Sequence, residues 1–175
     1  MADGGRRQAR ERALSLLYEA ESKDLAPTTV LNELPVEPDP FTMELVRGVS
    51  QHFPELDALI TTYARDWTIE RMPALDRALL RMAIFELAHR PDVPTGVVIS
   101  EAVELAGRFS TDESSRFVNG MLARIAEEIR PPSGKAAGRG SEAEPVDAKV
   151  VGAGPAVDDQ AATGQVVEDG LHQQG

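Results

Sequence analysis

The sequence contains no cysteine and no long apolar run. Without cysteine, disulfides, thiolate metal sites and thiol nucleophiles are excluded. The longest apolar stretch, around residues 79–87, is interrupted by Arg81 and Glu86 and is far shorter than a membrane span. The start of the chain, MADGGRRQARERA, has no apolar run behind its charges and therefore lacks the form of a signal peptide. We expect a cytoplasmic protein that makes no contact with a membrane.

Positive charge is also scarce, because 18 Lys and Arg face 29 Asp and Glu, a net charge of −11. This excludes a polycationic nucleic-acid coat but not a small basic face. Residues 131–175 contain eight of the 14 glycines and none of the eight aromatic residues. Such a segment buries too little apolar surface to offset its ordering entropy. The sequence predicts a folded domain over residues 1–130 and a disordered acidic tail over 131–175.

The first 130 residues show helical periodicity and no convincing β-alternation. Proline and capping residues divide them, with Asp39, Thr95 and Thr111 as expected N-caps. The segment after Pro73 is apolar on both faces and is expected at the centre of the domain. The expected fold class is all-α, a compact bundle of about seven helices. Their expected positions are 6–21, 29–34, 40–53, 56–67, 73–90, 96–109 and 112–129.

Arginines form two clusters that suit phosphate binding. Arg6 and Arg10 are one helical turn apart with Arg7 beside them, so three guanidinium groups can share one helix face. Arg77 and Arg81 are spaced i, i+4 and form a second cationic strip. The alternative for both clusters is an ordinary solvated surface.

Two aromatic residues near helix ends, Tyr18 and Phe117, are candidates to stack on unpaired bases. Aromatic residues at helical spacing are more often part of the core. Gly120, inside the last helix, costs about 1 kcal/mol relative to alanine. A close approach of two helices would explain that glycine.

Signals for an enzyme are weak. There is no GxSxG motif and no phosphate-binding glycine loop, and the histidines lack metal-ligand spacing. We therefore expect no enzymatic activity, no metal and no cofactor. The three histidines are His52, His89 and His172.

Three blocks, RRQARERALSLLYEAE, LDRALLRMAIFELAHRPDVP and VISEAVELAGRFSTDESSRFVNGML, resemble the NusB family in sequence and in order. The resemblance covers most of residues 6–130. It implies an all-helical, non-catalytic protein built of two packed sub-bundles that binds the boxA element of ribosomal RNA leader transcripts. It also implies NusE, a protein of the small ribosomal subunit, as a partner, and through it RNA polymerase with other Nus factors.

The resemblance also implies which residues face RNA. Arg6, Arg7 and Arg10 correspond to the family's arginine-rich start and are expected to meet RNA phosphates. The other positions that match the family's RNA-facing surface and its acidic capping turn are Tyr18, Arg77, Arg81, Asp112, Glu113 and Phe117.

Two other functions remain open from the sequence. The first is a helical protein-binding adaptor without direct RNA contact. The second is an RNA-modifying enzyme, which would need a separate catalytic chain because no nucleotide-binding βαβ region follows residue 130. A homodimer of the free protein is also possible, because an apolar patch meant for NusE would otherwise be exposed.

Overall fold

The computed structural model describes residues 3–64 and 68–131. Within these two ranges the chain is helical and contains no strand, which confirms the all-α prediction. Trp67 and the predicted tail beyond Pro131 lie outside the described residues. The helices are α1 (Asp3–Lys23), α2 (Pro27–Asn32), α3 (Pro40–Gln51), α4 (Phe53–Tyr63), α5 (Ala74–His89), α6 (Thr95–Phe109) and α7 (Asp112–Ile129), with a 3₁₀ turn η1 (Ile69–Arg71) before α5.

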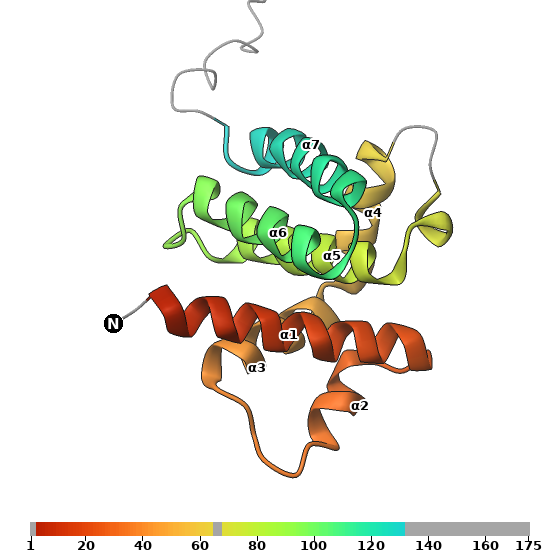
Figure 1. Ribbon diagram of the computed structural model, residues 1–175, viewed down its shortest axis with the longest axis vertical. Helices are drawn as coiled ribbons and strands as arrows, with labels where there is room; N and C mark the ends of the chain where they lie inside the picture. Colours follow the sequence, from red (N-terminus) through yellow and green to blue (C-terminus); the bar gives the residue numbers. More distant parts are fainter. Residues whose placement is uncertain (1–2, 65–67, 132–175) are drawn as a thin grey trace, which may run out of the picture. The chain divides into compact units, whose positions relative to one another are not determined.

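The helices form the two packed sub-bundles that were expected (Figure 1). Helices α1, α2 and α3 pack on one another, and α4 to α7 form the second group. Helix α5 joins the two groups because it contacts α1 and α3 as well as α4, α6 and α7. We call the contact of α1 and α3 with α5 the seam. No helix in the described ranges combines the length and hydropathy needed to cross a bilayer.

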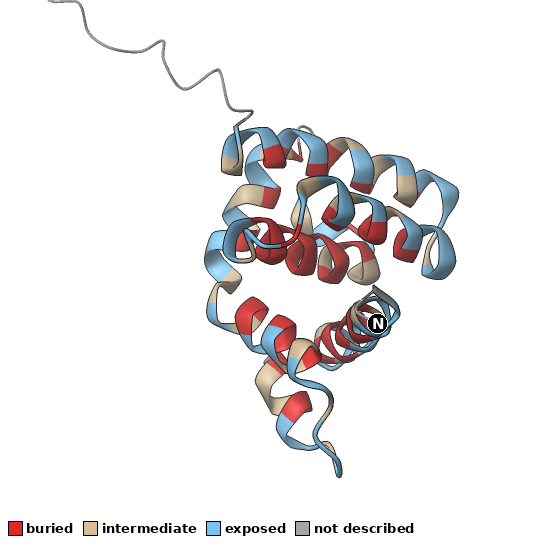
Figure 2. Ribbon diagram, turned by 90° about the vertical axis from the view of Figure 1, so that its left-hand side faces the viewer, coloured by how far each residue is buried: buried red, intermediate tan, exposed pale blue. Residues whose placement is uncertain are grey.

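Helix α5 lies at the centre of the core, as predicted. All residues from Ala78 to Leu87 are buried, and α5 is the most continuously buried helix in Figure 2. The other helices each turn one apolar stripe inward. Burial on all sides explains why the sequence of α5 lacks a polar face.

Two of the three expected caps are present. The Asp39 carboxylate accepts the backbone N–H groups of Phe41 at 3.1 Å and Thr42 at 3.0 Å. The Thr111 hydroxyl oxygen accepts the N–H of Ser114 at 3.1 Å. The prediction for Thr95 was wrong, because Pro94 occupies the N-cap position and Thr95 is already helical.

The close helix approach that was expected at Gly120 occurs instead at Gly48. A Cβ atom on Gly48 would lie 2.0 Å from the ring of Phe85, so α3 can approach α5 only with glycine there. At Gly120 a Cβ atom would meet nothing within 4 Å. The explanation predicted for Gly120 is therefore wrong.

Candidate nucleic-acid interface

Arg10 belongs to the apolar stripe of α1, because Ala13, Leu14 and Leu17 follow it at i+3, i+4 and i+7. Its side chain is consequently turned into the seam, and the residue is only 3% exposed. The guanidinium group makes two hydrogen bonds to the Glu86 carboxylate, one of them 2.9 Å long from Nε to Oε2. Arg10 does not share an open face with Arg6 and Arg7.

Arg6 and Arg7 lie at the surface but are already paired with carboxylates. Arg7 Nη2 lies 2.7 Å from Glu101 Oε1, and Arg7 Nη1 lies 2.9 Å from Glu104 Oε1. Arg6 Nη2 lies 3.4 Å from Asp92 Oδ2. An incoming phosphate would have to compete with these carboxylates. The Arg6–Asp92 pair is exposed on both sides and therefore weak, whereas Glu101 is only 8% exposed, so a phosphate would displace Arg7 from its partner less easily.

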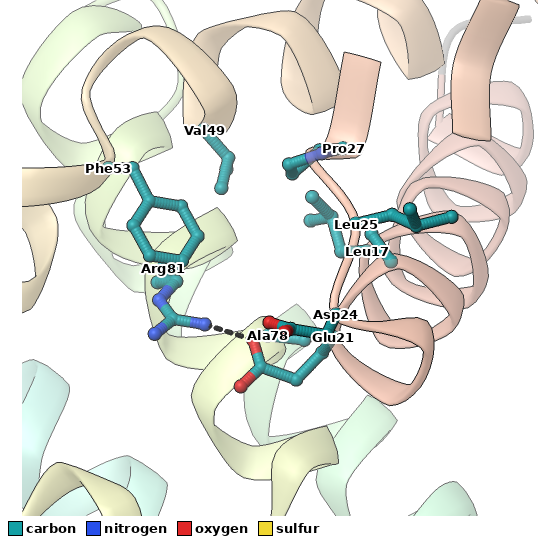
Figure 3. Close-up of a pocket in the computed structure, with 10 residues that line it drawn as sticks. Leu17, Glu21, Asp24, Leu25, Pro27, Val49, Phe53, Ala78 and Arg81 are labelled. Atoms are coloured by element: carbon teal, nitrogen blue, oxygen red, sulfur yellow. Dashed lines mark hydrogen bonds and ion pairs between the residues drawn. The ribbon is translucent and has the colours of Figure 1, made fainter. Parts of the chain in front are cut away.

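Arg77 and Arg81 do not form an open cationic strip. Arg81 is only 4% exposed, and its guanidinium group bonds to Asp57 and to Glu21. Figure 3 shows its bond to Glu21 at the edge of a cavity of about 250 Å³. Arg77 bonds to Glu21 Oε1 at 2.7 Å and to the carbonyl oxygen of Met72 at 2.7 Å. Both arginines therefore tie α5 to the end of α1.

Tyr18, which was expected to face RNA, is exposed at the surface. It is 44% exposed and lines a cavity of about 350 Å³ together with Phe109, which is 46% exposed. The Arg108 guanidinium carbon lies 5.0 Å from the centre of the Phe109 ring. Phe109 was not predicted as a site residue. Phe109 is the last residue of α6, directly before the turn to α7. An aromatic residue at a helix end was the signal in the sequence that could have identified it.

Phe117 and Glu113 line a second cavity, of about 310 Å³, together with Met72, Pro73 and Asp76. Thr111 and Ser114 complete its lining. Asp112 is exposed on the same turn but is not part of this lining. The Tyr18 cavity and the Phe117 cavity are neighbours. Leu75 and Ser110 line the Tyr18 cavity, and the residues that directly follow them in the sequence, Asp76 and Thr111, line the Phe117 cavity.

Three exposed arginines near these cavities have no hydrogen-bond or ion-pair partner for their side chains within the described ranges. Arg12 lines a further cavity, which shares Glu11 and Ser15 with the Tyr18 cavity. Arg71 directly precedes Met72, and Arg116 directly precedes Phe117. None of the three was among the predicted site residues. We call six residues around these two cavities the rim: the exposed Arg12, Tyr18, Arg71, Phe109 and Arg116, and the partly buried Phe117.

The histidines that the structure describes form an aromatic stack. The ring centres of His52 and His89 are 4.1 Å apart, and Phe85 lies 4.9 Å from His89. Partial burial of its ring, together with the neighbouring His52, lowers the pKa of His89. Among the described residues no group of three histidine or acidic side chains is arranged to hold a metal ion.

Comparisons of the sequence with protein families and with known proteins point to the same family. The family model described as the NusB family matches residues 7–127. The transcription antitermination protein NusB of Kineococcus radiotolerans is 48% identical over 126 residues, which is 70% of this chain and 93% of the relative.

Solved structures share the fold. The structure of T. maritima NusB has a TM-score of 0.66 and 33% identity, covering 72% of this chain and 93% of the other. A complex of antitermination factors NusB and NusE with double-stranded RNA contains a chain with a TM-score of 0.62. That chain is 24% identical, and the match covers 72% of this chain and 98% of the other.

Proposed function

The chain belongs to the NusB family of transcription antitermination proteins, and from this premise we propose that it binds boxA RNA of ribosomal RNA leader transcripts together with NusE. In this role it suppresses termination by RNA polymerase in the cytoplasm, in a complex with other Nus factors. A protein of the same fold has been crystallised with NusE and double-stranded RNA, which supports both partners.

The observation that carries the proposal is the rim. Two half-exposed aromatic rings from distant parts of the chain, Tyr18 and Phe109, line one cavity. Exposed aromatic rings stack on unpaired bases, and arginines without a protein partner are available to phosphates. Arg12, Arg71 and Arg116 are such arginines. This combination suits a single-stranded RNA segment.

Within this surface the predicted residues take different roles. We assign Arg6, Arg7, Tyr18 and Phe117 to direct RNA contact. Asp112 and Glu113 lie in the first turn of α7, and we assign to them the acceptance of hydrogen bonds from base amino groups.

Arg10, Arg77 and Arg81 act as positioning residues. Their guanidinium groups are held by carboxylates of other helices, so they fix α1 and the turn before α5 without meeting RNA. RNA affinity depends on them only through the shape of the seam.

The acidic total makes a basic partner important. With a net charge of −11, the chain repels a polyanion at long range, and this repulsion weakens as salt rises. A partner such as NusE that supplies positive charge would strengthen binding. When that partner is absent, the surface meant for it is available for a homodimer.

Fluorescence anisotropy of labelled boxA RNA, measured with and without NusE, tests the proposal. We expect weak binding by the chain alone, tighter binding with NusE, and a preference over a scrambled RNA of equal length. Equal affinity for both RNAs in the presence of NusE would contradict the proposal.

One observation favours the alternative adaptor function. Arg6 and Arg7 already have carboxylate partners, which is the arrangement of an ordinary surface. An adaptor without RNA contact would keep full antitermination activity after Arg12 and Arg116 are changed to alanine, whereas an RNA-binding protein would lose part of it. A run-through transcription assay on a boxA template separates the two functions.

A further inference from the structure

His52 and His89 lie where the chain passes from one sub-bundle to the other. His52 is both the C-cap of α3 and the N-cap of α4, so the chain crosses between the two groups of helices at this corner. His89 is the last residue of α5. The ring centres of the two histidines are 4.1 Å apart. The pair therefore connects the α3–α4 corner to the end of α5.

The two histidines continue a contact that Gly48 and Phe85 begin. Gly48 precedes His52 by four residues, and Phe85 precedes His89 by four residues, so the histidine pair lies one helical turn further along α3 and α5. Phe85 fills the space that a side chain at Gly48 would need. Its ring centre lies 4.9 Å from that of His89 and 5.9 Å from that of His52. The three rings thus form one end of the seam.

Of the two histidines, only His52 has a carboxylate partner among the described residues. Its Nδ1 atom lies 3.1 Å from Glu55 Oε2, in the first turn of α4. The charges that act on the His89 ring are those of His52 and Glu55. The other charged side chains at this end of α5 are engaged in ion pairs or with backbone carbonyl oxygens: Glu44, Arg90, Asp92 and Arg130.

The end of α5 gives little support to a positive charge on His89. A cation in the last turn of a helix is ordinarily stabilised by the free carbonyl oxygens there. Here Arg130 already donates hydrogen bonds to carbonyl oxygens of the last turn and its cap. Burial of its ring, and after it the neighbouring His52, lowers the pKa of His89, and Glu55 offsets part of this effect.

We propose that His52 and His89 form an acid-sensitive joint between the α3–α4 corner and the end of α5. When uncharged, the two rings stack beside Phe85 and close this end of the seam. A proton on His52 is matched by Glu55, whereas a proton on His89 adds a second positive charge in a ring whose centre is only 4.1 Å away. The rings then separate and the corner loosens from α5. The packing of the two sub-bundles thereby responds to pH, independently of RNA.

Acid should destabilise the folded chain through His89. Because the pKa of His89 in the folded chain lies below its ordinary value of 6.5, the unfolded chain binds this proton more readily. The free energy of unfolding therefore decreases as the pH falls below 6.5 and levels off below the folded-state pKa. The chain has three histidines and no cysteine, so few other side chains titrate in this range.

Urea unfolding at about pH 7.5 and at about pH 5.5 tests the joint. EDTA is present at both pH values, so that a metal ion bound by the imidazoles cannot contribute. We expect the urea midpoint of the unchanged chain to be lower in acid. His89→Phe keeps an aromatic ring but cannot take up the proton, so it should lose most of this difference. The matched control, His172→Gln, changes a histidine outside the described residues and should keep the difference.

Proton NMR titration of the histidine rings gives a measurement that a purely packing role would not affect. We expect His89 to titrate below 6.5 in the unchanged chain. In His52→Gln, which removes the neighbouring positive charge, its titration should move up towards that value. Comparison with His172→Gln identifies the signal of the third histidine.

Hydrogen exchange shows where the chain loosens. After correction for the intrinsic pH dependence of exchange, acid should lower the protection of amides at the end of α3 and leave the contact between α6 and α7 protected. A loss of protection that is uniform over the helices would overturn the proposed joint.

The other measurements can also overturn the inference. An undiminished acid shift of the urea midpoint in His89→Phe would do so, as would a His89 ring that titrates at or above 6.5. If His52→Gln leaves the titration of His89 unchanged, the two rings are not coupled and the joint does not exist. Should His89→Phe fail to fold, the titrations of the unchanged chain and of His52→Gln still decide the matter.

Discussion

The seam and the rim use the same side chain in opposite ways. In the seam, Arg10 and Arg81 are buried, and each is bonded to carboxylates from other helices. At the rim, Arg12 and Arg116 are exposed and have no side-chain partner within the described ranges. Arg10 and Arg12 are two residues apart on one helix, yet the first stabilises the fold and the second is available to a ligand. Arginine content alone therefore does not locate a phosphate-binding surface.

The seam also shows why α1 packs in one direction only. Arg10, in the first half of α1, meets Glu86 near the end of α5, whereas Glu21, near the end of α1, meets Arg77 and Arg81 in the first half of α5. The charges of the two helices match only in this antiparallel arrangement. A parallel arrangement would place like charges together. These ion pairs thus favour the antiparallel arrangement of α1 and α5 over the parallel one.

The largest expected effect comes from breaking the seam at its most buried pair. Arg10→Ala leaves Glu86, which is 1% exposed, as a buried carboxylate without its main partner. Removing one member of a buried pair destabilises a protein by about 3–5 kcal/mol. Urea unfolding measures this loss. The matched control is Arg47→Ala on α3, an exposed arginine without a partner in the described ranges, which should change stability by less than about 0.5 kcal/mol.

Equal stability of the two variants would show that the buried ion pair between Arg10 and Glu86 does not stabilise the fold. RNA binding then serves as a second measurement. At a temperature where Arg10→Ala remains folded, its salt dependence of RNA binding should equal that of the unchanged chain, because Arg10 meets no phosphate.

The second largest effect is expected at Gly48, also in the seam. Gly48→Ala places a Cβ atom 2.0 Å from the Phe85 ring, so the ring or helix α3 must move. Overpacking of this kind costs about 1–3 kcal/mol, which outweighs the gain of about 1 kcal/mol from replacing a helical glycine. We expect a lower urea midpoint. A variant as stable as the parent would mean that the two helices can separate without cost.

Much of this division was readable from the sequence. Arg10 precedes Ala13, Leu14 and Leu17 at helical spacing, so its place on the buried face follows from periodicity. Its grouping with Arg6 and Arg7 used the one-turn spacing of Arg6 and Arg10 but not the apolar residues that follow Arg10, and it therefore missed this. Its partner Glu86 lies 76 residues away, and no local pattern identifies such a partner.

The fold was predictable for a different reason. Helix positions depend on apolar spacing and on breakers such as Pro40 and Pro73, which are local signals, and they agree with the structure to within a few residues. Thr95 failed as a cap because Pro94 before it already takes that position. Phe109 became a candidate only through the cavity that it lines, which forms from segments far apart in the chain.

A smaller effect of opposite sign is expected at Gly120, the glycine near the rim. Nothing lies within 4 Å of a Cβ atom there, so Gly120→Ala gains helix propensity without a clash. We expect the variant to be more stable by up to about 1 kcal/mol, in contrast to Gly48→Ala. Urea unfolding of the two variants side by side measures the contrast. A loss of stability in Gly120→Ala would indicate that another part of the chain covers this position.

The smallest effect on stability and the clearest on binding are expected for the rim arginines. Arg12→Ala and Arg116→Ala remove exposed guanidinium groups without partners in the described ranges, so each should change the free energy of unfolding by less than about 0.5 kcal/mol. Each should weaken RNA binding to all sequences alike and reduce the slope of log affinity against log salt concentration by about one unit. Arg47→Ala, whose side chain lines neither cavity, should leave that slope unchanged. If Arg12→Ala and Arg116→Ala behave like Arg47→Ala, the rim does not contact phosphate. The arginines of the seam and of the rim would then differ only in how far they are buried.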